Sequence, residues 1–450
     1  MKKLLVFTVA ALLWMCVAGC GGGPTTDDRL VILSPHWEGI QDEFEVGFAD
    51  HWKVTTGRTV DVEWLDQGGT SSILRFIRSQ FDNRPEGIDI DIFFGGGIDP
   101  HLKLKKQGLT IPFVLPDSIL SRIPTTFAGI PMYDTTGHWY GATLSGFGVV
   151  YNSAVAKLKG LPIPKDWAGM SDPAMEGWIF AGDPRQSGSV HMAYEIMLQA
   201  YGWEKGWQVI TAMAANSRGF ARSAGDIPRA VSRGDAVAGM CIDFYAWAEV
   251  NRSEPGRMGF VYPPNLTVVN PDAMCILKGA PNMKVAQAFV RFIMSEQGQR
   301  IWCLKMGQPG GPRENQLNRF TVMPDLYAKY GKTLAVTINP FSWEGSFVYD
   351  SRKGSVRWGI VNDMIGAMLI DSQNELNAAW KSMKARKSVD EGITALAKAP
   401  ITEAEALELG ALWSQQSLRN KHIGRWTDFA RQKYAEVNRG QYKPLSRVGI

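Results

Sequence analysis

Gly141 to Asn152 read Gly-Ala-Thr-Leu-Ser-Gly-Phe-Gly-Val-Val-Tyr-Asn, an apolar run with three glycines about a third of the way along this 450-residue chain. The composition predicts an extended segment, because β-branched and aromatic residues favour strands. Short apolar strands alternate with helical patterns on both sides of it, from Arg29 before and from Ile179 after. Such alternation is typical of α/β architecture. We therefore predict two α/β units joined by a crossing segment that hinges near Ser145.

In both units, the predicted strands end in loops of small or polar residues. Strands predicted over 30–33, 60–64 and 88–94 lead into the loops Ser34 to Trp37, Gly68 to Ser72 and Gly95 to Gly97. In the second unit, strands over 179–181 and 237–242 lead into Asp183 to Ser189 and Asp243 to Tyr245. Asp99-Pro100 has the pattern of an N-cap followed by proline at the first helical position.

These loops indicate where a ligand binds. In open α/β sheets, ligands collect beyond the carboxyl ends of strands, where the free backbone amides of the next helix attract negative charge. Glycines allow close approach of the backbone, and hydroxyl groups add donors. The loops favour a ligand with an oxyanion, although any one of them is equally consistent with a plain turn or N-cap.

The predicted ligand-binding residues come from these loops, from the hinge and from the start of a short helix over 223–233. They are Ser34, His36, Gly69, Thr70, Ser71, Gly96, Gly97, Ser145, Ser187, Gly188, Ser189, Ser223, Asp243 and Tyr245. A carboxylate at Asp243 would suit a ligand hydroxyl or amine, and Tyr245 offers a phenol donor and a stacking face. Arg185 and Arg222 are further candidates for contact with an anion, and a surface turn is the alternative for Asp243 and Tyr245.

The N-terminus resembles a bacterial lipoprotein signal. Met-Lys-Lys precedes an apolar run from Leu4 to Val17, and Ala18-Gly19-Cys20 follows. About 14 apolar residues are fewer than the ~20 that a spanning helix needs. We expect residues 1–19 to be a signal peptide, Cys20 to carry a lipid that anchors the protein to a membrane, and residues 20–28 to form a tether. An ordinary secretory signal is the alternative.

Charge and cysteine content exclude several classes of protein. Removing Lys2 and Lys3 with the signal leaves 46 of the 48 basic residues against 44 acidic ones. No basic stripe with interleaved aromatics stands out, so a nucleic-acid partner is not expected. Cys241, Cys275 and Cys303 have no metal-ligand spacing. Buried free thiols are expected, with one disulfide possible.

A helix that ends in Ser295-Glu-Gln-Gly-Gln299, followed by the turn Gly307-Gln-Pro309, resembles extracytoplasmic solute-binding proteins of ABC importers. The similarity is greatest to the branch that includes ferric-iron, phosphonate and phosphorylated-sugar binders, and it covers roughly residues 30 to 385. The resemblance implies an α/β, two-lobe periplasmic-binding-protein fold of type II, with hinge strands and the ligand between the lobes. It also implies an extracytoplasmic location and a partner ABC permease, and we expect a monomer.

The resemblance and the strand pattern together give a predicted domain division. Lobe 1 takes residues 29–140 and 256–330, and lobe 2 takes 141–255. Residues 331–450 form a mainly helical C-terminal region packed on the lobes. Trp358, Met364, Met368 and Leu376 recur there at helical spacing.

Other functions have weaker support in the sequence than solute binding. In ferric-iron relatives, paired tyrosines stand where this chain has Asp243-Phe244-Tyr245, so His36 and Tyr245 are the remaining candidate metal ligands, with Tyr151 nearby. No Gly-x-Ser-x-Gly or His-Glu-x-x-His motif is present. We expect no enzyme activity and no cofactor. A ferric-iron carrier is the first alternative, and a surface lipoprotein hydrolase or a sensory receptor is the alternative of another class.

Overall fold

The computed structural model describes residues 28–343 and 347–450. The predicted signal peptide, the lipidation site Cys20 and all of the predicted tether before Asp28 lie outside the described residues. Within the described ranges, no helix has the combined length and apolar character that crossing a bilayer requires.

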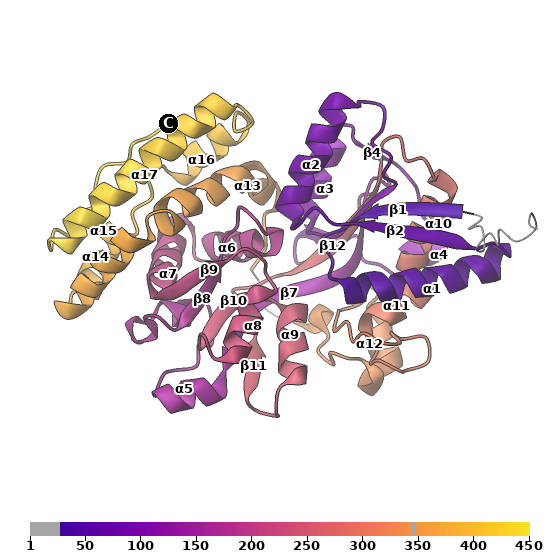
Figure 1. The fold of residues 1–450 in the computed structure, drawn as a ribbon, viewed down its shortest axis with the longest axis horizontal. Coiled ribbons are helices and arrows are strands. Elements are labelled where there is room, and N and C mark those ends of the chain that lie inside the picture. Colours follow the sequence, from indigo (N-terminus) through magenta and orange to yellow (C-terminus); the bar gives the residue numbers. More distant parts are fainter. Residues whose placement is uncertain (1–27, 344–346) are drawn as a thin grey trace, which may run out of the picture.

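One mixed sheet runs through both lobes and not through the C-terminal helices (Figure 1). Its strand order is β2-β1-β3-β12-β7-β10-β8-β9, with β11 beside β7 and β4 beside β12. Its strands are β1 (Asp28–Leu33), β2 (Val60–Leu65), β3 (Ile92–Phe94), β4 (Thr110–Ile111), β7 (Tyr140–Asn152), β8 (Ile179–Gly182), β9 (Ser217–Ala221), β10 (Ala238–Ile242), β11 (Met258–Val261) and β12 (Val269–Leu277). The short strands β5 (Thr126–Phe127) and β6 (Ile130–Pro131) pair separately.

Lobe 1 is the part of the molecule built on β2, β1, β3 and β12. Its helices are α1 (Glu38–Thr56), α2 (Thr70–Asn83), α3 (Ile98–Lys106), α4 (Asp117–Leu120), α10 (Met283–Met294), α11 (Glu296–Cys303) and α12 (Asp325–Tyr330). Leu30 of β1, Phe44 of α1 and Trp302 of α11 are fully buried, and the rings of Phe44 and Trp302 lie 4.4 Å apart. The strand predicted over 88–94 is shorter than expected, because Asp89 takes a left-handed conformation with φ of 60°.

Lobe 2 is the part built on β10, β8, β9 and β11. Its α-helices are α5 (Ser153–Lys159), α6 (Gly188–Ala200), α7 (Trp203–Asn216), α8 (Asp226–Arg233) and α9 (Asp243–Arg252), and 3₁₀ turns occupy Ala168–Ser171 and Pro173–Met175. Strand β11 pairs with β7 from Asn152 to Val149 on this side of the sheet. Residues 258–261 therefore lie in lobe 2, and the predicted boundary at 256 comes too early.

Strand β7 belongs to both lobes. Its residues from Tyr140 to Gly146 pair with β12 of lobe 1, and those from Phe147 to Tyr151 pair with β10 of lobe 2. The run Gly141 to Asn152 is thus a single extended strand, as its composition predicts. The place where the pairing changes partner lies beside Ser145 and Gly146.

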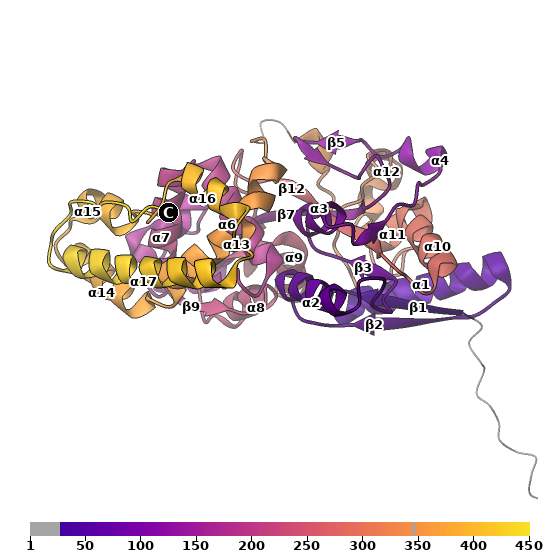
Figure 2. The same ribbon diagram turned by 90° about the horizontal axis from the view of Figure 1, so that it is seen from above.

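The C-terminal region, defined here as residues 347–450, packs mainly on lobe 2 (Figure 2). Its helices are α13 (Ser351–Ile365), α14 (Gln373–Ala385), α15 (Val389–Leu396), α16 (Glu403–Gly410) and α17 (Gln416–Asn438), with a π-helical turn at Gly366–Ile370. A capping box of Thr402 and Glu405 begins α16.

Residues 331–343 differ from the predicted helical pattern. Apart from 3₁₀ turns at Gly331–Thr333 and Pro340–Ser342, they are irregular, and the Phe341 ring lies 4.8 Å from Phe127 of lobe 1. Cys241, Cys275 and Cys303 are buried free thiols, so the possible disulfide among them does not form.

Candidate functional site

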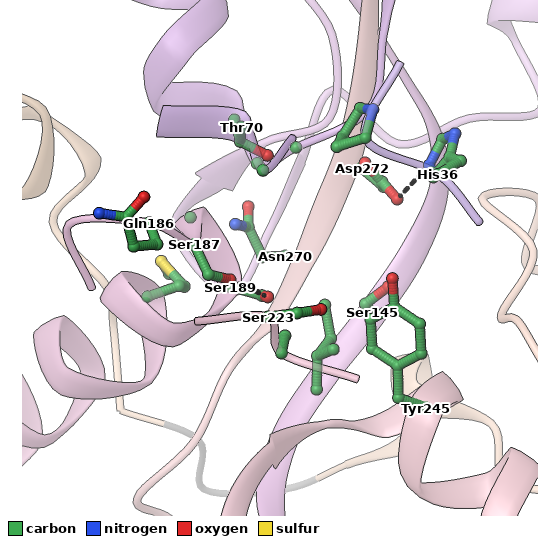
Figure 3. A pocket seen from close by; sticks show the side chains of 18 of the residues that line it. His36, Thr70, Ser145, Gln186, Ser187, Ser189, Ser223, Tyr245, Asn270 and Asp272 are labelled. Atoms are coloured by element: carbon green, nitrogen blue, oxygen red, sulfur yellow. Dashed lines mark hydrogen bonds and ion pairs between the residues drawn. The ribbon is translucent and has the colours of Figure 1, made fainter. Parts of the chain in front are cut away.

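A cavity of about 450 Å³ lies between the two lobes. Both lobes and the shared strands contribute to its walls (Figure 3). One residue of the C-terminal region, Trp358, also lines the cavity. Its lining comprises Pro35, His36, Asp66, Gly68, Gly69, Thr70, Ser72, Gly96, Gly97, Asp99, Ser145, Phe147, Gln186, Ser187, Gly188, Ser189, Met192, Arg222, Ser223, Ala224, Ile242, Phe244, Tyr245, Asn270, Pro271, Asp272 and Trp358. This volume lies within the range typical of small-molecule sites.

Three helices begin at this cavity. Gly69, Gly97 and Ser187 are the N-cap residues of α2, α3 and α6, and each lines the cavity. The first N–H groups of a helix have no partner within the helix and carry roughly half a positive charge. Because the glycine caps have no side chain that accepts these N–H groups, the backbone amides of α2 and α3 are open to an anion.

The lobes touch where α2 meets α6. The side chain of Arg75 in α2 donates to the carbonyl oxygen of Arg185 in lobe 2 at 3.4 Å. A Cβ added to Gly69 would overlap with the carbonyl oxygen of Gln186, and one added to Gly188 would lie 2.9 Å from Cβ of Thr70. Glycine at positions 69 and 188 therefore lets the two helix ends approach each other.

A second group of polar side chains lies on the strands that form the other wall. Asp272 of β12 accepts from Nε2 of His36 at 3.1 Å and is ion-paired with Arg319. The Arg319 guanidinium is fully buried and lies 4.1 Å from the Phe244 ring centroid. Burial opposes ionisation of Asp272, but Arg319 and His36 outweigh it and lower its pKa to about 2. Asp272 therefore stays ionised.

Several buried polar atoms of the lining residues have no hydrogen-bond partner within the described ranges. Four are on the His36 and Asp272 side of the cavity, namely Nδ1 of His36, Oγ of Ser145, Oδ1 of Asn270 and Oδ1 of Asp272, and a fifth is Oδ1 of Asp99. Leaving such a group unpaired costs about 1–3 kcal/mol. A bound ligand with hydroxyl or amine groups would find both donors and acceptors at this wall.

Asp99 adds a titratable group at the start of α3. Burial raises its pKa to about 7, although the nearby ammonium group of Lys103 favours the ionised form. The hydroxyl of Tyr349, from the C-terminal region, donates to Oδ2 of Asp99 at 3.1 Å. The N-cap of this helix is Gly97, so the predicted N-cap role of Asp99 is wrong.

Most of the predicted ligand-binding residues line this cavity. They are His36, Gly69, Thr70, Gly96, Gly97, Ser145, Ser187, Gly188, Ser189, Ser223 and Tyr245. Of the two candidate arginines, Arg222 lines it and is exposed, whereas Arg185 is held by Asp183 and Asp371.

Three predicted residues lie outside the lining. The Ser34 hydroxyl accepts the N–H of His36 at 3.1 Å and is fully buried, and Ser71 is buried inside lobe 1 while Ser72 reaches the cavity. Asp243 is also buried, because it accepts from N–H groups of Gly146 at 2.6 Å and Phe244 at 2.7 Å. Asp243 is the first residue of α9 and bonds to the backbone of the hinge and of its own helix, so it braces the hinge and does not line the cavity.

Lining residues that the sequence did not indicate as ligand-binding include Asn270, Asp272, Asp99 and Trp358. Asn270 and Asp272 are the polar members of an otherwise apolar strand, Val-Asn-Pro-Asp-Ala-Met-Cys-Ile-Leu, and polar residues in a buried strand could have revealed them. Asp99 was assigned to capping. Trp358 lies more than 80 residues after the last other lining residue, and no pattern in the sequence around it indicates that it reaches the cavity.

The candidate metal ligands His36 and Tyr245 both line the cavity. Burial raises the pKa of Tyr245 to about 12. Residues 28–343 and 347–450 contain no group of three or more His, Cys, Asp or Glu side chains placed to hold a metal ion.

Comparisons with known proteins give a family match and similar folds. The sequence model of the family described as "Bacterial extracellular solute-binding protein" matches residues 90–322. The chain is 32% identical over 158 residues to the phosphoglycerate transport regulatory protein PgtC of Salmonella typhimurium, which covers 35% of this chain and 39% of PgtC. The match thus spans well under half the length of that relative.

Among solved structures, the fold is similar to the periplasmic binding protein AfuA from Actinobacillus pleuropneumoniae with fructose-6-phosphate bound. The TM-score is 0.58, with 21% identity over 76% of this chain and 98% of AfuA. It is also similar to iron-bound HitA from Pseudomonas aeruginosa, with a TM-score of 0.57 and 16% identity over 75% of this chain and 99% of HitA. These likenesses confirm the predicted fold class.

Proposed function

We propose, since this chain belongs to the bacterial extracellular solute-binding protein family, that it captures a small anionic solute between its lobes and delivers it to an ABC permease. The observation that carries the proposal is the convergence of the N-termini of α2, α3 and α6 on one cavity. Three helix ends with hydroxyl groups beside them suit a phosphate or carboxylate group.

The two walls suit a ligand with two chemically different ends. Its oxyanion would bind the amides and hydroxyls around Thr70 and Ser189. The opposite end would bring hydroxyl groups to the ionised carboxylate of Asp272 and to Asn270. A small phosphorylated sugar or hydroxy acid has this combination, and the names of PgtC and AfuA, with phosphoglycerate and fructose-6-phosphate, support that ligand class.

Closure of the lobes would accompany binding. In this proposal β7 and β12 bend near Ser145, α6 approaches α2, and water is excluded from the polar contacts. No group in the cavity is required to make or break a bond, so the ligand leaves chemically unchanged. We keep lipidation of Cys20 as part of the proposal, because a tether beside the permease raises the effective concentration of the carrier.

A regulatory receptor is the second candidate function. The observation in its favour is the name of PgtC, a transport regulatory protein. In that case the closed form would signal to a membrane partner. Loss of solute uptake after deletion of this protein, with permease expression unchanged, would favour transport over regulation.

Isothermal titration of the chain from residue 21 onward tests the ligand class. The probes are 3-phosphoglycerate, fructose 6-phosphate, inorganic phosphate, glucose and ferric citrate. We expect at least one phosphate ester to bind and to stabilise the fold by about 2.7 kcal/mol at 100 times its dissociation constant. Binding of glucose or of iron, with none of the phosphate compounds bound, would overturn the proposal.

Two matched variants locate the binding. Thr70→Val removes a hydroxyl at the α2 end of the cavity and is expected to weaken phosphate-ester binding about 5- to 10-fold, or about 1–1.4 kcal/mol. Thr427→Val removes a helical hydroxyl of α17 that donates to the carbonyl of Ile423 at 3.0 Å, outside the cavity lining. Its affinity should equal that of the unmodified protein.

A further inference from the structure

The C-terminal region crosses from lobe 1 to lobe 2 beside the cavity. Val348 packs against Gly129 of lobe 1, and the hydroxyl of Tyr349 bonds to Asp99. One residue later, the N–H of Asp350 donates to Oε1 of Gln199 in α6 of lobe 2 at 2.8 Å. Helix α13 starts directly after this crossing, so its first turns lie between α3 and α6.

Helix α13 is fixed to α6 by fully buried polar contacts. The Arg357 guanidinium donates to both oxygens of Glu195, at distances between 2.8 and 3.1 Å, and both side chains are fully buried. Nδ1 of His191 lies 2.6 Å from Oδ1 of Asn362. Helix α6 also supplies Ser189 and Met192 to the cavity lining. The contacts between α13 and α6 therefore fix α13 relative to the wall of the cavity that α6 forms.

Trp358 follows Arg357 and lines the cavity. One face of its indole stacks on the His191 ring, with centroids 3.8 Å apart and planes 28° from parallel. Nζ of Lys103, from α3 of lobe 1, lies 5.4 Å from the ring centroid. The side chain is thus held by groups from both lobes, and only 7% of the residue is exposed.

We propose that Trp358 is a specificity-determining residue of the ligand cleft, supplied by the C-terminal region and not by either lobe. It forms a rigid wall near the start of α6 and limits how far a ligand extends beyond its oxyanion. The cleft then accepts short phosphorylated sugars or hydroxy acids and rejects esters that carry a bulky ring system. This inference rests on the proposed function, and it adds a residue outside the matched range 90–322 to the site.

The test measures the size selectivity of phosphate esters by isothermal titration. The probes are 3-phosphoglycerate, fructose 6-phosphate and adenosine 5′-monophosphate, and the proteins are the unmodified chain, Trp358→Ala, Trp358→Phe and the control Val356→Ala. Val356 lies on α13 with 40% of its surface exposed and does not line the cavity. Circular dichroism checks each fold, and Trp358→Phe keeps an aromatic ring against His191 should the alanine variant unfold.

We expect the ratio of adenosine monophosphate affinity to small-ester affinity to rise at least tenfold in Trp358→Ala, to rise less in Trp358→Phe, and to stay constant in Val356→Ala. A ratio that stays within twofold in both folded Trp358 variants, while the small esters bind, overturns the inference and leaves the proposed function intact. If no probe binds to any protein, the proposed function fails for phosphate esters and the inference fails with it.

Discussion

The two lobes and the C-terminal region contribute to the same cavity by different means. The lobes present backbone amides, glycines and small hydroxyl side chains from loops that follow strands. The C-terminal region presents one large side chain, Trp358, positioned by the buried pair of Arg357 and Glu195. Local α/β geometry is enough to place the amides, glycines and hydroxyl groups of the lobes. The position of Trp358 depends instead on a contact between two residues that are 162 positions apart.

The largest expected effect comes from breaking the contact that joins the two regions. Arg357→Met should lower the free energy of unfolding by about 3–5 kcal/mol, because it leaves the Glu195 carboxylate buried without its cation. Urea unfolding followed by circular dichroism measures this loss. Trp358 should at the same time lose its fixed position.

An exposed ion pair gives the control for that variant. Arg233→Met removes a pair with Asp235 in which the side chains are 67% and 50% exposed, and it should cost less than about 1 kcal/mol. Equal losses in the two variants would mean that the C-terminal region is not held by the buried pair.

The next largest effect is expected from a variant that hinders the approach of the two lobes. Gly69→Ala should weaken binding of a phosphate ester about 10- to 100-fold, or about 1.4–2.8 kcal/mol. The added methyl group would meet the Gln186 carbonyl across the cleft, while the N-cap φ of −69° suits alanine, so the lobe stays folded. Titration measures the affinity, and small-angle scattering should show a more open molecule.

Gly424→Ala is the matched control, since Gly424 lies in α17 and a Cβ there meets nothing within 4 Å. It should leave both affinity and scattering unchanged. A Gly69→Ala protein that binds as tightly as the original would show that closure does not bring these helix ends together.

The last effect is a pH dependence of stability that originates at the hinge residue Asp243. Burial raises the pKa of Asp243 to about 7, although Gly146 and other donors bond to it. Because Asp243 holds a proton in the folded state but not in the unfolded state between pH 4 and 7, its contribution to stability is present at low pH. This contribution falls by up to about 1.4 kcal/mol per pH unit as the pH rises toward 7.

Asp243→Asn, which is neutral at every pH, should flatten the stability profile between pH 5 and 7 relative to the unmodified protein. Urea unfolding at pH 5, 6 and 7 checks this. If the stability of Asp243→Asn falls with pH as steeply as that of the unmodified protein, the prediction is contradicted. Asp272, whose pKa is lowered to about 2, stays ionised over the same range and does not contribute.

Sequence patterns were reliable where a residue's role depends on its neighbours in the chain. The loops at Gly69, Gly97 and Ser187 were identified because each follows an apolar strand and precedes a helical stripe, and the structure places all three at the cavity. Sequence patterns did not show the position of side chains that had a choice of partners. Ser34 and Asp243 both bond to nearby backbone N–H groups, and strand order does not reveal such a choice.

The sequence by itself determined the two α/β units, the shared strand from Gly141 to Asn152 and the helix ends that favour an anion, because periodicity and turn residues act over short distances. Only the tertiary structure decided that Asp272 is ionised beside Arg319, that Asp243 braces the hinge and that Trp358 lines the cavity. These three depend on burial and on contacts between distant segments, where desolvation and the position of an opposite charge set the outcome.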